Sequence, residues 1–215
     1  MGLSRTIQIK FCENSKLFRQ NSIVIFLTSQ TQFNNVITII SATDRKGSNS
    51  LILAKAYEHF FKIKTKENVQ FLSLEDLPDD LFTYKMYDKT QISPALAELE
   101  QAYLIPAKKL FFVIPEYNGS FPGILKHFID ACSIKSKMAI FKDKKAGMAG
   151  VSTGRAGNLR GMEHFGSILN YLGVTVLPNR LPYSTFDKLL DENKNIKDAA
   201  TLKGLEAHVD EFLRF

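Results

Sequence analysis

Residues 115–123 carry the densest group of side chains and backbone groups that could hold a ligand. They read Pro-Glu-Tyr-Asn-Gly-Ser-Phe-Pro-Gly and directly follow the apolar run 110–114. Asn118 and Gly119 tolerate positive φ, and Pro122 suits the first turn of a helix. A buried strand, a stiff loop and a helix N-terminus facing that loop form the place where open α/β sheets bind ligands. The candidate ligand-binding residues here are Pro115, Glu116, Tyr117, Asn118 and Gly119.

A second loop, residues 41–50, has the composition of a phosphate site. It reads Ser-Ala-Thr-Asp-Arg-Lys-Gly-Ser-Asn-Ser and ends where Ser48 can cap a helix. Hydroxyl groups, backbone N–H groups, the positive end of a helix dipole and one guanidinium are the groups that bind a phosphate. The spacing alone fits an ordinary capped loop equally well, so both interpretations stay open. The candidate residues are Thr43, Arg45, Ser48, Asn49 and Ser50.

A third loop begins at Gly150 and allows two classes of function. Gly150-x-Ser152-x-Gly154 matches the nucleophile elbow of α/β-hydrolases, and Asp187 and His208 follow in the order of a catalytic triad. The pattern is short, and the chain has no His-Gly-Gly oxyanion motif. We also expect His208 to lie on the polar face of the last helix, exposed to solvent. A serine hydrolase that uses Ser152 is therefore the minor hypothesis.

The elements that must position these loops alternate along the chain. Short β-branched and apolar runs predict strands over residues 36–40, 69–74, 110–114, 145–151 and 174–176. Capping residues and apolar spacing predict five helices. Three begin near Ser48, Pro94 and Pro122, and the last covers residues 198–214. The fourth carries a single apolar stripe formed by Leu159, Met162, Phe165, Leu169 and Leu172. Strands that alternate with helices predict an α/β protein with a parallel sheet.

Composition and missing motifs exclude several other classes. The 215 residues fit one domain, and 45% hydrophobic with 23% charged residues is typical of a globular protein. No apolar run approaches the ~18 residues of a membrane span, so no membrane partner is expected. The net charge of +6 comes without a basic run interleaved with aromatic residues, so no nucleic-acid partner is expected either. The chain lacks GxGxxG, so no Rossmann-type dinucleotide clamp is expected, and it lacks GxxxxGK[ST], which argues against nucleoside-triphosphate hydrolysis. The four histidines form no HExxH motif or clustered ligand set, so no metal site is expected.

Cysteine usage favours a reducing compartment. Cys12 and Cys132 are far apart in the sequence and neither belongs to a CxxC pair. We expect no disulfide, a buried Cys132 that acts as a small hydrophobic residue, and a cytoplasmic location.

The loop after residue 114 also carries a family resemblance. Pro115-Glu116-Tyr117-Asn118-Gly119-Ser120, followed by Pro122-Gly123 and Leu125-Lys126, resembles the NAD(P)H-dependent FMN reductases, a flavodoxin-like group with azo, quinone and chromate reductases among its members. The resemblance runs from about Val36 to the C-terminus. It implies a flavodoxin-like three-layer sandwich, with a five-stranded parallel sheet of order 2-1-3-4-5 and FMN at the switch between the first and third strands.

The resemblance also implies roles for the three loops. Thr43, Arg45 and Ser48 match the family's phosphate loop, with Asn49 beside them, although Ala42 stands where the family commonly has glycine. Backbone amides near Tyr117, Asn118 and Gly119 are expected to hold the flavin ring. Tyr117 also fits simple packing, and Glu116 fits either a ribityl or backbone hydrogen bond or a cap on the next helix. Ser152, Thr153, Gly154 and Gly157 match a loop whose small residues let N–H groups approach the ring edge.

The activity implied by the resemblance is a two-step oxidoreduction. NADPH or NADH passes a hydride to the flavin N5, and a small-molecule acceptor then takes two electrons. A quinone, azo dye, nitro compound, metal oxyanion or free flavin all fit, and the sequence does not choose among them. The alternative is an FMN-binding electron carrier or regulator, although the basic pI of about 9.2 disfavours a flavodoxin-like carrier. The family resemblance further implies a homodimer or homotetramer.

Residues 1–35 precede the family-like region and form a predicted N-terminal extension. They hold four basic residues against Glu13, which is half of the net charge. They show no clear signal-peptide core with a small-residue cleavage site. We assign the extension no function and place the FMN-binding domain at residues 36–215.

Overall fold

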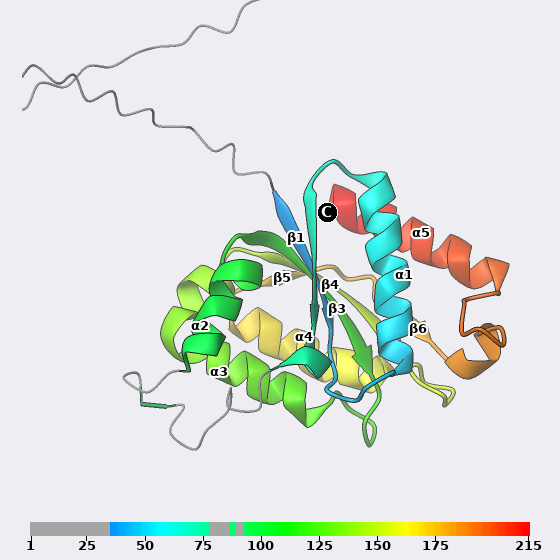
Figure 1. The fold of residues 1–215 in the computed structure, drawn as a ribbon, viewed down its shortest axis with the longest axis horizontal. Coiled ribbons are helices and arrows are strands. Elements are labelled where there is room, and N and C mark those ends of the chain that lie inside the picture. The colour runs from blue at the N-terminus through cyan, green and yellow to red at the C-terminus, as the bar shows by residue number, and fades with distance from the viewer. Residues whose placement is uncertain (1–34, 78–86, 89–92) are drawn as a thin grey trace, which may run out of the picture. The chain divides into compact units, whose positions relative to one another are not determined.

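The computed structural model describes residues 35–77, 87–88 and 93–215, except for the side chains of residues 135–138 (Figure 1). All of the predicted extension but Asn35, and with it Cys12, lies outside the described residues. Part of the Asp- and Pro-containing loop after the second strand lies outside them as well.

The five predicted strands form at the predicted places, and their ends differ from the prediction by at most three residues. The strands of the sheet are β1 (Val36–Ser41), β2 (Asn68–Ser73), β3 (Ala107–Pro115), β4 (Lys145–Val151), β5 (Thr175–Val176) and β6 (Leu181–Tyr183). All of the pairings are parallel, and the order β2-β1-β3-β4-β5 is the predicted flavodoxin-like order. All six residues of β1 and six of the nine residues of β3 are buried, because helices cover both faces of the sheet.

The sixth strand was not predicted. β5 pairs with β4 only at Lys145 and Ala146, and β6 pairs with the other end of β4, from Ala149 to Val151. The last edge of the sheet is therefore interrupted, and Pro178 falls inside the interruption. A strand of three residues that contains Pro182 has too weak a pattern to be recognised from sequence, since proline removes a ladder hydrogen bond.

Five α-helices of the described residues cover the two faces of the sheet (Figure 1). They are α1 (Asn49–Lys64), α2 (Pro94–Leu99), α3 (Gly123–Ile140), α4 (Leu159–Tyr171) and α5 (Ala199–Arg214). Figure 1 shows α1 and α5 together on one side and α2, α3 and α4 on the other. The helix expected from Pro94 is shorter than predicted, because it changes to a π-helical turn over Glu100–Leu104.

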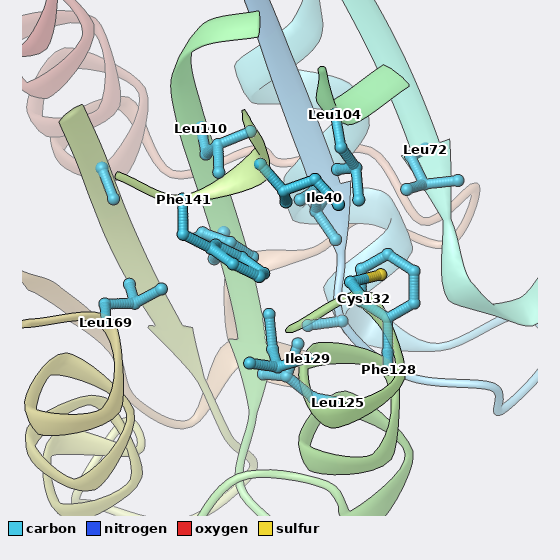
Figure 2. Packing of buried hydrophobic residues seen from close by; sticks show 14 of the residues in the cluster. Ile40, Leu72, Leu104, Leu110, Leu125, Phe128, Ile129, Cys132, Phe141 and Leu169 are labelled. Atoms are coloured by element: carbon cyan, nitrogen blue, oxygen red, sulfur yellow. The ribbon is translucent and has the colours of Figure 1, made fainter. Parts of the chain in front are cut away.

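Each face of the sheet buries its own hydrophobic cluster. Ile40, Leu110, Phe112 and Met148 face the cluster shared with α3 and α4, whereas Ile39 and Phe111 face the cluster shared with α1 and α5. Figure 2 shows part of the first cluster, where side chains of the sheet meet those of α3. Cys132 lies in this cluster and is fully buried, as predicted, and burial raises the pKa of its thiol well above the ordinary value.

Two predicted exposures are wrong. His208 was expected on the polar face of the last helix, but it is 1% exposed and packs against Tyr57 and Phe111 in the cluster under α1 and α5. Leu159 was expected on the apolar stripe of its helix, but it is 49% exposed. Leu159 is the first residue of α4 and follows Asn158, whose backbone is left-handed. It therefore precedes the buried residues of the helix, which begin at Gly161.

Because all strands are parallel, the loops after β1, β3 and β4 leave the sheet at the same edge (Figure 1). These are the three loops that the sequence singled out. In the described part of the chain, no helix has the length and apolar character to cross a membrane.

Candidate functional site

The three loops together form a cavity of about 490 Å³. That volume lies within the range of small-molecule sites, which is roughly 300–1,000 Å³. Every predicted site residue lines the cavity except Gly157, and the additional lining residues are Lys46, Gly47 and Val151. All three additional residues belong to the same loops or to the end of β4.

The first wall is the loop between β1 and α1, and it presents donors for an anion. Ser48 caps α1: its Oγ accepts the N–H of Leu51 at 3.2 Å and shares a hydrogen bond of 2.8 Å with the Ser50 hydroxyl. The N–H groups of Asn49 and Ser50 precede the first intrahelical bond and the first turn contains no acidic residue, so the positive end of the helix dipole is not neutralised there.

Ala42, which stands where the family commonly has glycine, does not line the cavity. Its N–H donates to the carbonyl of Val113 at 3.0 Å, and its methyl group packs in the hydrophobic cluster with 0% exposure. The chain first turns at the next residue, where Thr43 Oγ1 accepts the N–H of Arg45 at 3.2 Å. Gly47 supplies the positive φ, 62°, that brings the loop to the start of α1.

The second wall is a tight turn at the end of β3. Tyr117 and Ser120 exchange two backbone hydrogen bonds, of 2.9 and 3.0 Å, around Asn118 at φ 51° and Gly119 at φ 78°. Two successive residues with positive φ are the signature of a type I′ turn, which explains the Asn-Gly pair. The turn uses the N–H of Tyr117 for itself, so the N–H groups of Asn118 and Gly119 are the better candidates to meet a ligand.

A hydroxyl pair joins the first and second walls. Tyr117 Oη lies 2.9 Å from Thr43 Oγ1, and the Thr43 side chain is almost fully buried. Since Thr43 also accepts the N–H of Arg45, this pair ties the conformation of the phosphate-type loop to that of the Asn-Gly turn. Tyr117, which also lines the cavity, therefore does more than pack.

The outer side of the turn rests on α4, which sequence reasoning missed. The guanidinium of Arg160 lies 3.7 Å from Glu116 Oε1 and packs beside Gly119, and His164 Nδ1 lies 3.1 Å from Ser120 Oγ. Arg160 and His164 lie about 40 residues beyond the turn in sequence, and no local pattern links them to it. The Glu116 carboxylate thus faces Arg160, not the start of the following helix.

The third wall is the loop after β4. Ser152 Oγ donates to the carbonyl of Gly154 at 3.1 Å and accepts the N–H of Gly157 at 3.1 Å, so the hydroxyl organises its own loop. The loop also bonds to β6, through Ser152 N–H to the Tyr183 carbonyl at 3.0 Å. Gly157 lies behind the wall against Pro182, which explains why it does not line the cavity.

These contacts do not fit a serine hydrolase. Ser152 bonds to its own loop, and the two ring nitrogens of His208 bond to Tyr57 and to the Asn179 carbonyl. A nucleophile needs a base within hydrogen-bond reach, and His208 contacts neither Ser152 nor Asp187 in any hydrogen bond or ion pair of the described residues. The triad order in the sequence is therefore coincidental.

Asn158 fixes the second and third walls relative to each other. It adopts the left-handed conformation, φ 65°, directly before α4 and is 1% exposed. Its Nδ2 donates to the carbonyls of Ile114 and Pro115, at 3.0 and 2.9 Å, where β3 ends. The last two carbonyl groups of β3 therefore keep a hydrogen-bond partner where the strand ends and the turn begins.

Replacing Asn158 by alanine should lower the free energy of unfolding by about 2–3 kcal/mol, because two buried carbonyls lose their partner and alanine disfavours positive φ. Urea denaturation followed by circular dichroism measures this. Asn193→Ala is the matched control, since Asn193 is an exposed asparagine and should change stability by less than about 0.5 kcal/mol. An equal loss in both variants would contradict the role given to Asn158.

The wall chemistry fits a flavin phosphate ester. The lining includes two cations, Arg45 and Lys46, and one carboxylate, Glu116, which faces the Arg160 guanidinium. The anion donors gather on the first wall, while the second and third walls offer backbone groups of the Asn-Gly turn and of Ser152–Gly154. An elongated ligand with a phosphate at one end and a planar polar ring at the other matches this division. Among the described residues, no group of three or more His, Cys, Asp or Glu side chains is placed to hold a metal ion.

Strand order and cavity position together define a flavodoxin-like protein, with the cavity at the switch between β1 and β3. The chain belongs to the NADPH-dependent FMN reductase family, whose sequence profile matches residues 36–187. The matched region contains all three walls of the cavity.

Individual relatives agree with this assignment over part of their length. A 2-hydroxy-1,4-benzoquinone reductase from a Burkholderia species is 28% identical over 120 residues, which cover 55% of this chain and 66% of that protein. An NAD(P)H-dependent FMN reductase from Pseudomonas aeruginosa is 36% identical over 81 residues, which cover 38% of this chain and 43% of that protein. The chain thus spans less than two thirds of either relative in these matches.

A solved structure shows the same fold over nearly its whole length. The flavoenzyme NAD(P)H:(acceptor) oxidoreductase FerB from Paracoccus denitrificans superposes with a TM-score of 0.66 at 21% identity, covering 84% of this chain and 96% of that chain. At this level of identity, the similarity establishes the fold.

Proposed function

We propose that this protein is an NAD(P)H-dependent, FMN-containing oxidoreductase that reduces a small-molecule acceptor. The observation that carries the proposal is the three-walled cavity at the β1/β3 switch of a member of the NADPH-dependent FMN reductase family. Bound FMN would supply the redox chemistry, by accepting a hydride and passing two electrons on. The remaining task of the protein is to bind and orient the flavin and to shield it from water.

Each wall has a separate part in that task. Arg45, the Thr43 hydroxyl and the N–H groups of Asn49 and Ser50 hold the phosphate, because they combine a guanidinium with the positive end of α1. The N–H groups of Asn118 and Gly119 lie at a turn fixed by Asn158 and α4 and orient the ring from one side. Ser152, Thr153 and Gly154 face the ring from the third wall.

The acceptor is proposed to be a quinone, since one of the relatives acts on a benzoquinone. Azo dyes, nitro compounds, metal oxyanions and free flavin are the other acceptors that this kind of site serves. Steady-state oxidation of NADPH by the FMN-loaded protein, with and without 1,4-benzoquinone, tests the proposal. We expect turnover that depends on both FMN and quinone. FMN-loaded protein that oxidises neither NADPH nor NADH with any of these acceptors would contradict it.

An FMN-binding electron carrier would use the same three walls, so the cavity alone does not separate the two functions. Family membership and the basic pI of about 9.2 favour the reductase.

We also propose a cytoplasmic location, supported by the free thiol of Cys132, and a homodimer or homotetramer, supported by the exposed Tyr171 and Leu159 of α4. Light scattering that gives a monomer at working concentration would contradict the oligomer.

A further inference from the structure

A chain of buried polar side chains links α5 to the edge strand β6. His208 Nδ1 lies 2.8 Å from Tyr57 Oη of α1, and Tyr57 Oη lies 2.9 Å from Tyr183 Oη of β6. At the other end, His208 Nε2 lies 3.3 Å from the backbone carbonyl of Asn179. The Tyr57 and His208 side chains are at most 1% exposed, and Tyr183 is 7% exposed. None of these residues lines the cavity.

The chemistry of the partners fixes the direction of the hydrogen bonds. A carbonyl only accepts, so His208 Nε2 carries the hydrogen and Nδ1 accepts from the Tyr57 hydroxyl. The Tyr57 oxygen then accepts from the Tyr183 hydroxyl. All three groups are neutral, because burial lowers the pKa of His208 and raises the pKa of Tyr57 and of Tyr183, the latter to about 12.

The Tyr183 end of this series of hydrogen-bonded side chains holds the third wall of the cavity. Tyr183 accepts the N–H of Ser152 at 3.0 Å through its backbone carbonyl. The two following contacts continue the attachment, since Thr185 N–H donates to the Gly154 carbonyl at 2.9 Å and Phe186 N–H donates to the Ser152 carbonyl at 3.0 Å. β6 has three residues and is paired with β4 alone, so its side-chain anchor carries much of its placement.

We propose that His208 is a positioning residue for FMN: through Tyr57 and Tyr183 it holds β6, and thereby the Ser152–Gly154 wall, in the arrangement that binds the flavin. The inference rests on the proposed function. It adds that residues of α1 and α5 remote from the cavity set its affinity. It also assigns a role to the histidine that the triad pattern in the sequence had suggested as a base.

Protonation of His208 should weaken FMN binding. The groups that face the His208 ring are Tyr57 from α1, the Asn179 carbonyl before β6, the Phe111 ring from β3, and the carboxylate of Glu211, which lies one turn further along α5. Protonation places a hydrogen on Nδ1, so the ring stops accepting from Tyr57 and the hydrogen of the Tyr57 hydroxyl has to turn away from the ring. Neutral His208 therefore favours the binding arrangement.

Two substitutions test the link at neutral pH. His208→Leu removes the acceptor for Tyr57, and Tyr183→Phe removes the last hydroxyl, so each should raise the FMN dissociation constant about three- to tenfold. The double variant should be no weaker than the weaker single variant, because both substitutions break the same link. Phe212→Leu is the control: Phe212 is buried on α5 in the same cluster but lies outside the polar chain, so it should lower the melting temperature without changing FMN affinity.

The pH dependence separates positioning from simple destabilisation. His208→Asn places an acceptor oxygen near the position of Nδ1 but does not titrate, so it should restore FMN affinity at pH 7.5. As the pH falls below 6.5 and approaches the lowered pKa of His208, wild type should lose affinity more steeply than His208→Asn. The FMN phosphate also titrates near pH 6, but it does so equally for both proteins and cancels in the comparison.

The outcomes distinguish this inference from the proposed function. Wild-type protein that does not bind FMN at pH 7.5 would overturn the proposed function and, with it, the inference. Wild-type protein that binds FMN while His208→Leu binds equally well would overturn the inference alone. FMN affinity that falls in Phe212→Leu as far as in His208→Leu, or identical pH profiles for wild type and His208→Asn, would also overturn it.

Discussion

Replacing Gly150 by alanine should lower the free energy of unfolding by about 3 kcal/mol or more and weaken FMN binding by at least about tenfold. A Cβ at this position would lie 2.2 Å from the backbone carbonyl oxygen of Gly157 and 2.9 Å from the end of Met162. A side chain such as Met162 can move, but the backbone oxygen belongs to the loop of the third wall. The variant can therefore fold only by displacing that loop, and affinity and stability fall together.

The measurement for Gly150→Ala is thermal unfolding combined with an FMN fluorescence titration. For a protein of this size the melting temperature should fall by about 6–12 °C. Gly204→Ala is the matched control, since a Cβ there meets nothing within 4 Å and the residue lies inside α5. That variant should be stabilised by up to about 1 kcal/mol and should bind FMN normally. A Gly150→Ala protein as stable as wild type would contradict the packing described for β4 and its loop.

Replacing Arg45 by alanine should raise the FMN dissociation constant about 10- to 100-fold, because a hydrogen bond to a charged group contributes about 1.5–3 kcal/mol. Arg45 lines the first wall beside the N-terminus of α1, which is the place assigned to the phosphate. Its backbone, not its side chain, makes the contact with Thr43, so the truncation leaves the loop hydrogen bond in place.

Riboflavin makes the Arg45 experiment specific, since it has the flavin ring and the ribityl chain but no phosphate. Arg45→Ala should weaken FMN binding while leaving riboflavin binding unchanged. Lys46→Ala is the control for general charge, since Lys46 lines the same wall with the same formal charge. It should cost only about two- to threefold, as expected for a flexible point charge. Equal losses for FMN and riboflavin would show that Arg45 does not bind the phosphate.

Much of this architecture could be predicted because the informative signals are local. The β-branched run from Val36 and the small-residue run from Lys145 define strands by their own composition, and Ser48 marks the start of α1 by its capping chemistry. The Asn118-Gly119 pair likewise encodes its own turn through two positive φ values. Once the sheet is parallel, topology alone brings the three loops to one edge.

The missed features depend on contacts between distant segments. His208 looks like a solvated helix residue until Tyr57, 151 residues earlier, supplies its buried partner. β6 forms because β5 pairs with only two residues of β4 and leaves the rest of that edge free. The sequence of β6 itself does not show that this edge is free. Arg160 supports the Asn-Gly turn across 44 residues of chain, and nothing local to either segment indicates the pairing.

The central claim, that the cavity holds FMN and that NAD(P)H reduces it there, is tested most directly by an anaerobic spectral titration. The purified protein, reconstituted with FMN and freed of excess flavin, should show the visible absorption of a bound flavin. Addition of NADPH or NADH without oxygen should then bleach that absorption, with one nucleotide consumed per flavin. A protein that retains no FMN, or a bound flavin whose absorption neither nucleotide changes, would contradict the account.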